Sequence, residues 1–202
     1  MRKHLSAAVF AVLLSTSAFA AEPRAASPAP AKPASSKPTE GQPLPAGWRW
    51  VTAEDGKFRA AFPSQPSVEH STEDTEAGKA QTVTYSVTSE ADGSFLAVAV
   101  TKFPDGTMAQ ALPSQVLEGA RDGALANVNG KIVTDKSVMV DGPKGGKRFY
   151  PGRDYEATGA QGTRISTRVI LVEDRLYQII FVRTAEKNEP FKQLLPTFAL
   201  QQ

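Results

Sequence analysis

The chain has 202 residues, of which 23 are lysine or arginine, 21 are aspartate or glutamate and none is cysteine. The lack of cysteine excludes disulfide bonds, thiol catalysis and a lipid-acceptor thiol. The near balance of charge argues against non-specific binding to nucleic acid, which depends on an excess of basic side chains that neutralise phosphates.

Residues 1–20 have the three parts of an export signal. Arg2 and Lys3 form a basic head, Leu5 to Leu14 an apolar run, and Ala18-Phe19-Ala20 a cleavage site. Cleavage after Ala20 would lower the 23 basic residues by two, to equal the 21 acidic ones. The apolar run is about half of the ~20 residues that a membrane-spanning helix needs, and no other stretch approaches that length. We therefore expect a periplasmic or secreted protein that does not span a membrane.

The next stretch, 21–46, contains seven prolines and seven alanines and almost no large apolar side chain. Such a composition cannot bury enough surface to offset chain entropy, so it predicts a disordered linker with polyproline II bias. The linker could be a spacer or a passive leader. The passive reading is favoured, because cleavage of the signal would leave no anchor at its free end. The remainder, 47–202, has the length of a single domain.

Alternating and β-branched residues predict the first strands of this domain, and a change to helical spacing follows them. Pro113 suits the first turn of a helix, and an apolar stripe from Val116 to Ala124 continues it. Gly119 and Gly123 either weaken this helix or let it lie close on a sheet. Strand pieces broken by Pro151-Gly152 indicate an edge strand or a bulge. The predicted strands are 48–51, 57–62, 67–71, 81–88, 94–103, 132–140, 147–150 and 154–157, with an acidic loop at 73–78.

The clearest element is a β-hairpin over 163–182 with a turn at Glu173-Asp174. Pairing Val172 with Arg175 places Leu171 opposite Leu176 on one side and Ile170 beside Tyr177 on the other. Both sides are apolar near the turn, so the hairpin should lie in the middle of a sheet that is covered on both faces. A short helix over 186–195 and a final extended stretch at 198–200 close the chain. The fold class predicted is α+β, with a mainly antiparallel sheet and helices on both faces.

Three short motifs resemble a bacterial group of exported domains with the fold of the photosystem II extrinsic protein PsbP. They are Asp55-Gly56-Lys57-Phe58 running to Phe62-Pro63-Ser64-Gln65-Pro66, then Asp174-Arg175-Leu176-Tyr177-Gln178-Ile179, and finally Phe191 with Thr197-Phe198-Ala199-Leu200. The resemblance implies an α/β/α sandwich. It also implies scaffolding or binding more than catalysis, because the family includes a photosynthetic accessory protein and a Ran-binding import factor. It carries no functional residue to this chain.

A cluster of basic and aromatic residues is the strongest candidate for a binding site. Arginine forks beside aromatic rings suit partners that carry carboxylates or phosphates, such as an envelope protein or another anionic component of the envelope. The alternative, which is favoured, is an edge strand kept soluble by its cations. The candidate residues are Lys144, Lys147, Arg148, Tyr150, Arg153 and Tyr155, with Phe149 among them.

Signs of catalysis or metal binding are weak, and no cofactor is predicted. His70 is the single histidine after residue 20, and no nucleophile or phosphate-loop motif accompanies it. Glu73, Asp74 and Glu76 could join His70 around a cation, but their spacing matches no known loop, so a solvated acidic turn is favoured.

Three functions therefore stay open. The favoured one is a non-enzymatic, soluble periplasmic interaction or accessory protein. The second is a carrier that holds a small amphiphile between sheet and helix; Arg164 and Arg168 could line such a groove or extend along the sheet margin. The third is a hydrolase that uses Asp154 and Glu156, which share a strand face.

Overall fold

The computed structural model describes residues 44–55, 57–75, 78–143, 147–184 and 189–201. The predicted signal and nearly all of the predicted linker lie outside the described residues. Within the described part of the chain, no helix is long and apolar enough to cross a membrane.

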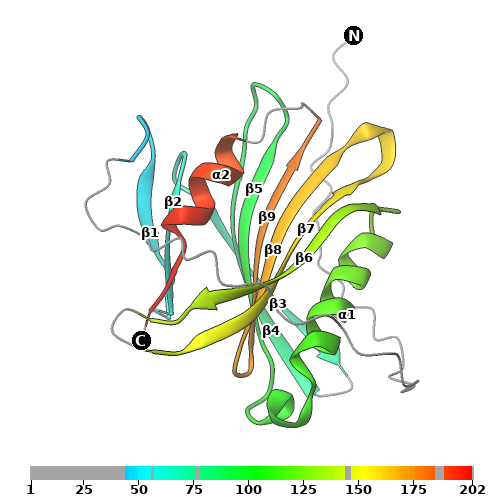
Figure 1. The fold of residues 1–202 in the computed structure, drawn as a ribbon. Coiled ribbons are helices and arrows are strands. Elements are labelled where there is room, and N and C mark those ends of the chain that lie inside the picture. Colours follow the sequence, from blue (N-terminus) through cyan, green and yellow to red (C-terminus); the bar gives the residue numbers. More distant parts are fainter. Residues whose placement is uncertain (1–43, 56, 76–77, 144–146, 185–188, 202) are drawn as a thin grey trace.

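A twisted antiparallel sheet of seven strands forms the centre of the domain (Figure 1). Its strands follow the order β3-β4-β5-β9-β8-β7-β6, so β3 and β6 are the edges. The bounds are β3 (Ser67–Thr75), β4 (Gly78–Thr88), β5 (Phe95–Lys102), β6 (Lys131–Asp141), β7 (Phe149–Thr158), β8 (Arg164–Val172) and β9 (Arg175–Arg183).

The hairpin β8–β9 lies inside this sheet, as the sequence predicts, and its register is confirmed. Val172 pairs with Arg175, Leu171 with Leu176 and Ile165 with Val182. Glu173 has a φ of 53° at the turn, the left-handed conformation that a two-residue hairpin turn requires. Because side chains alternate along a strand, this one register fixes which residues point to each face of the sheet.

One face of the large sheet, here called the β2 face, is covered by a second sheet and a short helix. The second sheet has the order β1-β2-β10, and Phe58 of β2 lies at the centre of the aromatic core beneath it. The Phe58 ring meets Tyr85 and Tyr177 edge-on at 5.2 and 6.3 Å between ring centroids, and it stacks on Phe198 at 5.7 Å. The bounds are β1 (Arg49–Thr52), β2 (Phe58–Phe62), β10 (Ala199–Leu200) and α2 (Glu189–Leu194).

The opposite face, here called the α1 face, contacts helix α1 (Pro113–Ala126). Leu117, Ala120 and Leu125 are its buried residues, and they pack in one cluster with β7, β8 and β9. The helix begins at Pro113, as predicted, and ends where the N–H of Gly130 donates to the carbonyl of Leu125 at 2.8 Å. The most extensive sheet contacts of α1 are with β8 and β7.

The prediction of a full α/β/α sandwich is therefore not borne out. The structure consists mainly of antiparallel sheets with two short helices, and the β2 face is covered largely by strands. Of the helix predicted at 186–195, residues 186–188 lie outside the described residues; α2 covers Glu189–Leu194, and a 3₁₀ turn, η3 (Leu195–Thr197), follows it. Two further 3₁₀ turns are η1 (Thr107–Gln110) and η2 (Ala160–Gly162).

Two local predictions are corrected. The acidic stretch beginning at Glu73 is not a loop, because β3 continues to Thr75 and pairs with β4 along its whole length. The predicted break at Pro151-Gly152 is absent, because β7 runs through it as one strand, but Phe149 to Pro151 pair with β6 alone, so this end of β7 is a local edge as predicted. Proline is tolerated there because the pairing with β8 begins only at Gly152, so the missing N–H of Pro151 removes no bond to that strand.

Candidate functional site

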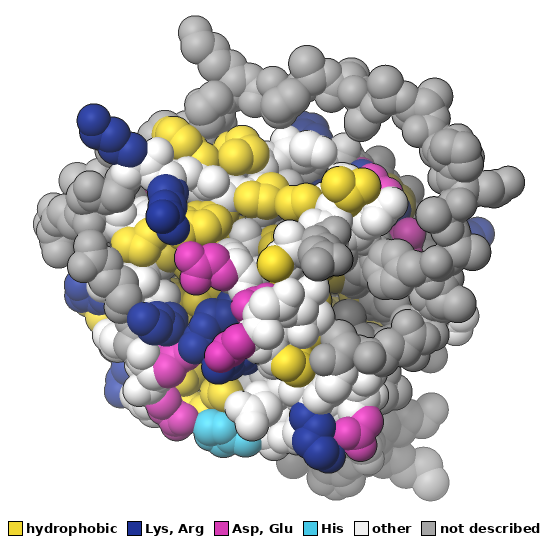
Figure 2. Space-filling view, turned by 90° about the horizontal axis from the view of Figure 1, so that it is seen from below, with side chains coloured by type: hydrophobic (Ala, Val, Ile, Leu, Met, Phe, Trp, Pro, Cys, Tyr) yellow, Lys and Arg dark blue, Asp and Glu magenta, His cyan; other side chains and the backbone are white. Residues whose placement is uncertain are grey.

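The predicted basic and aromatic cluster is not brought together. Lys147 and Arg148 are exposed at the start of β7, where Arg148 Nη1 lies 3.6 Å from Glu173 Oε1. Tyr150 is half-buried against the core of the β2 face, whereas Lys144 lies outside the described residues. Figure 2 shows basic and acidic side chains interspersed over the end of the molecule that it views, and not a uniform basic patch.

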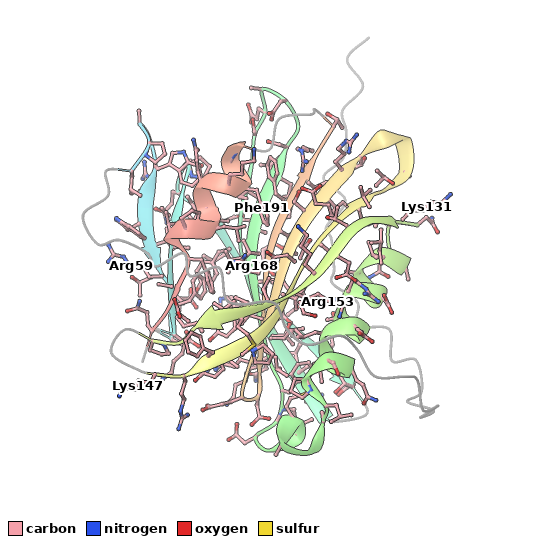
Figure 3. The ribbon with its side chains drawn as sticks, in the orientation of Figure 1. Arg59, Lys131, Lys147, Arg153, Arg168 and Phe191 are labelled. Atoms are coloured by element: carbon pink, nitrogen blue, oxygen red, sulfur yellow. The ribbon has the colours of Figure 1, made fainter. Side chains whose placement is uncertain are left out.

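Arg153 and Tyr155 point to the other face, because strand alternation separates them from Tyr150. Arg153 donates to Asp135 from Nε at 2.6 Å and from Nη2 at 2.8 Å, and it reaches Glu118 of α1 at 3.1 Å. Tyr155 is buried in the core beneath α1. Figure 3 shows Lys147 and Arg153 well apart. Binding by the exposed members of this cluster stays a prediction.

Three of the candidate catalytic and metal-binding residues, Asp154, His70 and Asp74, have ordinary partners, and Glu76 lies outside the described residues. Arg168 holds Asp154 through two hydrogen bonds of 2.6 and 2.7 Å, so this carboxylate is already neutralised. His70 Nε2 lies 3.3 Å from Glu54 Oε2, and Lys79 Nζ lies 3.0 Å from Asp74 Oδ1. Within the described part of the chain, no three histidine or acidic side chains converge as metal ligands would.

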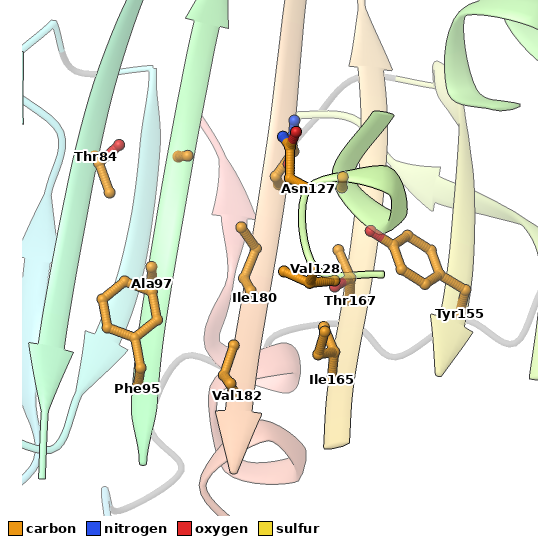
Figure 4. Close-up of a pocket in the computed structure, with 13 residues that line it drawn as sticks. Thr84, Phe95, Ala97, Asn127, Val128, Tyr155, Ile165, Thr167, Ile180 and Val182 are labelled. Carbon is orange, nitrogen blue, oxygen red and sulfur yellow. The ribbon is translucent and has the colours of Figure 1, made fainter. Parts of the chain in front are cut away.

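A groove between the C-terminal half of α1 and the large sheet is a candidate site (Figure 4). The space inside it that water-sized molecules can occupy is about 60 Å³. It exists because small side chains stand on both walls, with Ala97 and Ala99 on β5 and Ala124 on α1. The remaining lining residues are Thr84, Phe95, Asn127, Val128, Tyr155, Ile165, Thr167, Gln178, Ile180 and Val182. We call this site the helix–sheet groove.

Three polar side chains, Thr84, Thr167 and Gln178, lie on the otherwise apolar sheet side of the groove, and two of them are fully buried. Gln178 is 1% exposed and Thr167 is 2% exposed. Within the described part of the chain, Gln178 Nε2, Gln178 Oε1 and Thr167 Oγ1 make no hydrogen bond of ordinary distance and angle. A buried polar group left without a partner costs about 1–3 kcal/mol. The two Gln178 atoms carry this cost, whereas the Thr167 hydroxyl already interacts with the hydroxyl of Tyr155.

Tyr155 forms part of the groove wall next to Thr167. Burial raises the pKa of the Tyr155 hydroxyl, while the nearby Thr167 hydroxyl and the Arg121 guanidinium act in the opposite direction. The phenol therefore stays neutral and can donate or accept a hydrogen bond at any physiological pH.

An ion-pair network fastens α1 beside the groove. Asp135 of β6 accepts hydrogen bonds from Arg121 of α1 and from Arg153 of β7. Burial acts to raise the pKa of Asp135, but the two arginines outweigh it and hold that pKa below its ordinary value. The side chains of Arg121, Asp135 and Arg153 are only 13–16% exposed, so solvent screens these pairs less than it screens surface pairs.

Sequence reasoning missed the groove. It placed Gln178 opposite Val169, a register that is confirmed, but gave it no role. The available signal is that Gln178 is the only polar residue between Leu176 and Val182 of a strand that is apolar on both faces. A buried glutamine in such a run either makes hydrogen bonds within the protein or indicates a binding site.

Comparisons with known proteins concern the fold. No family model matches the chain, and no curated protein matches it. The structure is similar to the solution structure of cyanobacterial PsbP (CyanoP) from Synechocystis sp. PCC 6803, with a TM-score of 0.46 and 10% sequence identity. The match covers 80% of this chain and 96% of that chain. This likeness agrees with the resemblance of the sequence motifs to PsbP-like domains.

Proposed function

We propose that this protein is a non-enzymatic binding protein of the cell envelope that holds a small amphiphile in the helix–sheet groove. The observation that carries the proposal is the unpaired side-chain amide of Gln178 beneath an apolar groove. Ligand sites typically combine an apolar lining with a few polar groups that orient the ligand. The groove has this composition, since most of its lining side chains are apolar and a few, Gln178 among them, are polar.

The size of the groove limits how much of a ligand it encloses. A space of about 60 Å³ admits a group of a few non-hydrogen atoms. The remainder of a longer molecule would lie outside it. The periplasmic location belongs to the proposal, and it depends on the export signal and the linker predicted from the sequence.

A filling substitution tests the proposal. Ala124→Phe places a ring in the groove from α1, whereas Ala126→Phe places the same ring on the exposed side of the same helix. Small amphiphiles of different head groups should raise the melting temperature of the wild-type protein and of Ala126→Phe, but not that of Ala124→Phe. Native mass spectrometry of the protein purified from envelope fractions should show a bound small molecule in the first two proteins alone. An equal response from Ala124→Phe would remove the groove as the site.

A second candidate function rests on the exposed end of β7. Phe149 is 52% exposed beside the exposed Lys147 and Arg148, a combination suited to an anionic component of the envelope. The double substitution Lys147→Glu and Arg148→Glu should weaken sedimentation with anionic vesicles, whereas Lys79→Glu, on the β3–β4 hairpin, should not. Equal sedimentation of both variants and the wild type would end this candidate.

A further inference from the structure

The floor of the groove offers a donor and an acceptor side by side. The Gln178 side chain carries N–H groups on Nε2 and a carbonyl oxygen, Oε1, and both atoms lack a partner within the described residues. Thr167 lies on the neighbouring strand two residues from Val169, which is the residue directly opposite Gln178. Diagonal neighbours of this kind are about 7–8 Å apart, so one small head group can contact both side chains.

The lining makes a charged head group unfavourable. None of the groove's lining side chains carries a formal charge at neutral pH. The nearest charges that act on Tyr155 are Arg121, Asp135 and Asp122, and they are bonded to one another. A carboxylate or an ammonium group would lose its hydration there without gaining an opposite charge, which costs far more than burying a neutral polar group.

The walls suit a short aliphatic tail. Ala97, Ala99 and Ile180 form a low apolar surface beside the polar floor, and Val182 and Phe95 continue it toward the end of the strands. Contact with these side chains would add affinity without adding selectivity for a head group.

We infer that the groove selects amphiphiles whose head group is uncharged and both donates and accepts a hydrogen bond, as a carboxamide does. This inference rests on the proposed function, because it names the chemistry of the ligand for the same groove. An amide head forms two antiparallel hydrogen bonds with the Gln178 amide, and its remaining donor or acceptor can reach the Thr167 hydroxyl. An alcohol can make only part of this set, and an anion can make only the accepting half.

Four probes with the same six-carbon chain test the inference: hexanamide, hexanol, hexanoate and hexylammonium. Their dissociation constants are measured at neutral pH from chemical-shift changes of groove residues. We expect hexanamide to bind roughly tenfold more tightly than the two ions, since two neutral hydrogen bonds contribute on that scale. In Gln178→Leu the preference for hexanamide over the ions should disappear. In Gln81→Leu, which alters an exposed glutamine of β4 on the β2 face, it should persist.

The outcomes separate this inference from the proposed function. If hexanoate or hexylammonium binds the groove as tightly as hexanamide, the head-group inference is wrong and the proposed function stands. If none of the four probes shifts a groove residue, both are wrong. Retention of the preference in Gln178→Leu would overturn the inference as well. Gln178→Met, which keeps the length of the side chain, repeats the test if leucine prevents folding.

Discussion

The two faces of the seven-stranded sheet differ in the kinds of side chain that pack on them. The β2 face carries an aromatic core in which Phe58 is 0%, Tyr177 1% and Phe181 2% exposed. Burial there raises the pKa of Tyr177 to about 12, and the Tyr85 hydroxyl accepts a hydrogen bond from the N–H of Glu54 at 2.8 Å. The α1 face instead combines small side chains, unpaired polar atoms and an ion-pair network.

The difference shows how one sheet can separate stability from binding. Dense aromatic packing on the β2 face stabilises the fold and leaves little space for another molecule. The α1 face gives up part of that packing and keeps polar atoms unpaired, which lowers stability unless a ligand binds. The five predictions that follow test this separation.

The largest effect should come from the β2 face. Phe58→Ala removes the ring that contacts Tyr85, Tyr177 and Phe198, and should lower the free energy of unfolding by about 3–5 kcal/mol. Denaturant unfolding followed by circular dichroism measures the loss. Phe149→Ala, at a ring that is 52% exposed, should change the same quantity by less than about 0.5 kcal/mol. Similar losses in the two variants would mean that the β2 face is not where stability is concentrated.

Disrupting the ion-pair network should cause the second largest loss in the free energy of unfolding. Asp135→Ala leaves Arg121 and Arg153 without their shared carboxylate and should lower the free energy of unfolding by about 3 kcal/mol, the lower end of the range for buried pairs. Asp105→Ala, at a carboxylate that is 87% exposed beside Lys102, should cost less than about 1 kcal/mol.

The same network predicts a dependence on pH. Because the pKa of Asp135 is lowered in the folded state, its contribution is complete above the unfolded pKa of about 4 and is lost as the pH falls through the folded value. The wild-type protein should therefore lose more stability than Asp135→Asn between neutral pH and strongly acidic pH. Parallel losses would show that the network does not hold α1 to the sheet.

A substitution in the groove should change the free energy of unfolding by a smaller amount and in the opposite direction, by raising it. Gln178→Leu replaces two unpaired polar atoms with apolar ones and should raise the free energy of unfolding by about 1–2 kcal/mol in the absence of ligand. Gln81→Leu should change it by less than about 0.5 kcal/mol. A substitution that stabilises the protein while it removes ligand selectivity would mark Gln178 as a binding residue. A clear loss of stability would instead show that the amide already has partners.

The smallest effect should come from the exposed side of α1. A Cβ added at Gly119 meets no atom within 4 Å, so Gly119 is not needed for close packing on the sheet. Gly119→Ala should raise stability by about 0.5–1 kcal/mol through the higher helix propensity of alanine. Thermal unfolding with matched wild-type samples measures this change, and a decrease would contradict it.

Structural features that depend on a short stretch of sequence, such as a turn or the start of a helix, could be predicted from the sequence. A two-residue turn at Glu173 fixes the register of β8 with β9, and Pro113 marks the first residue of α1. Features that depend on contacts between residues far apart in the sequence could not be predicted. The second sheet requires β10, whose two residues pair with Arg59 and Phe58 from the opposite end of the domain.

The candidate site follows the same rule. Breaking β7 at Pro151 hid the alternation that separates Tyr150 from Arg153 and Tyr155, so the sequence grouped residues that point to opposite faces. The groove could not be predicted from the sequence for a different reason. Whether Gln178 finds a hydrogen-bond partner depends on what α1 places above it, and no local pattern reports that.

The pairing of β5 with β9 has a consequence for the order in which this chain can fold. Phe95 lies opposite Val182, Asp55 bonds Arg175, and the N–H of Ala61 donates to the hydroxyl of Thr197. Such separations give a high contact order, which slows folding because long loops must close first. During synthesis from the N-terminus, the chain therefore has two separate half-sheets, β3-β4-β5 and β6-β7-β8, until β9 is made. The strand β9 joins the two half-sheets only when almost the whole domain has been synthesised.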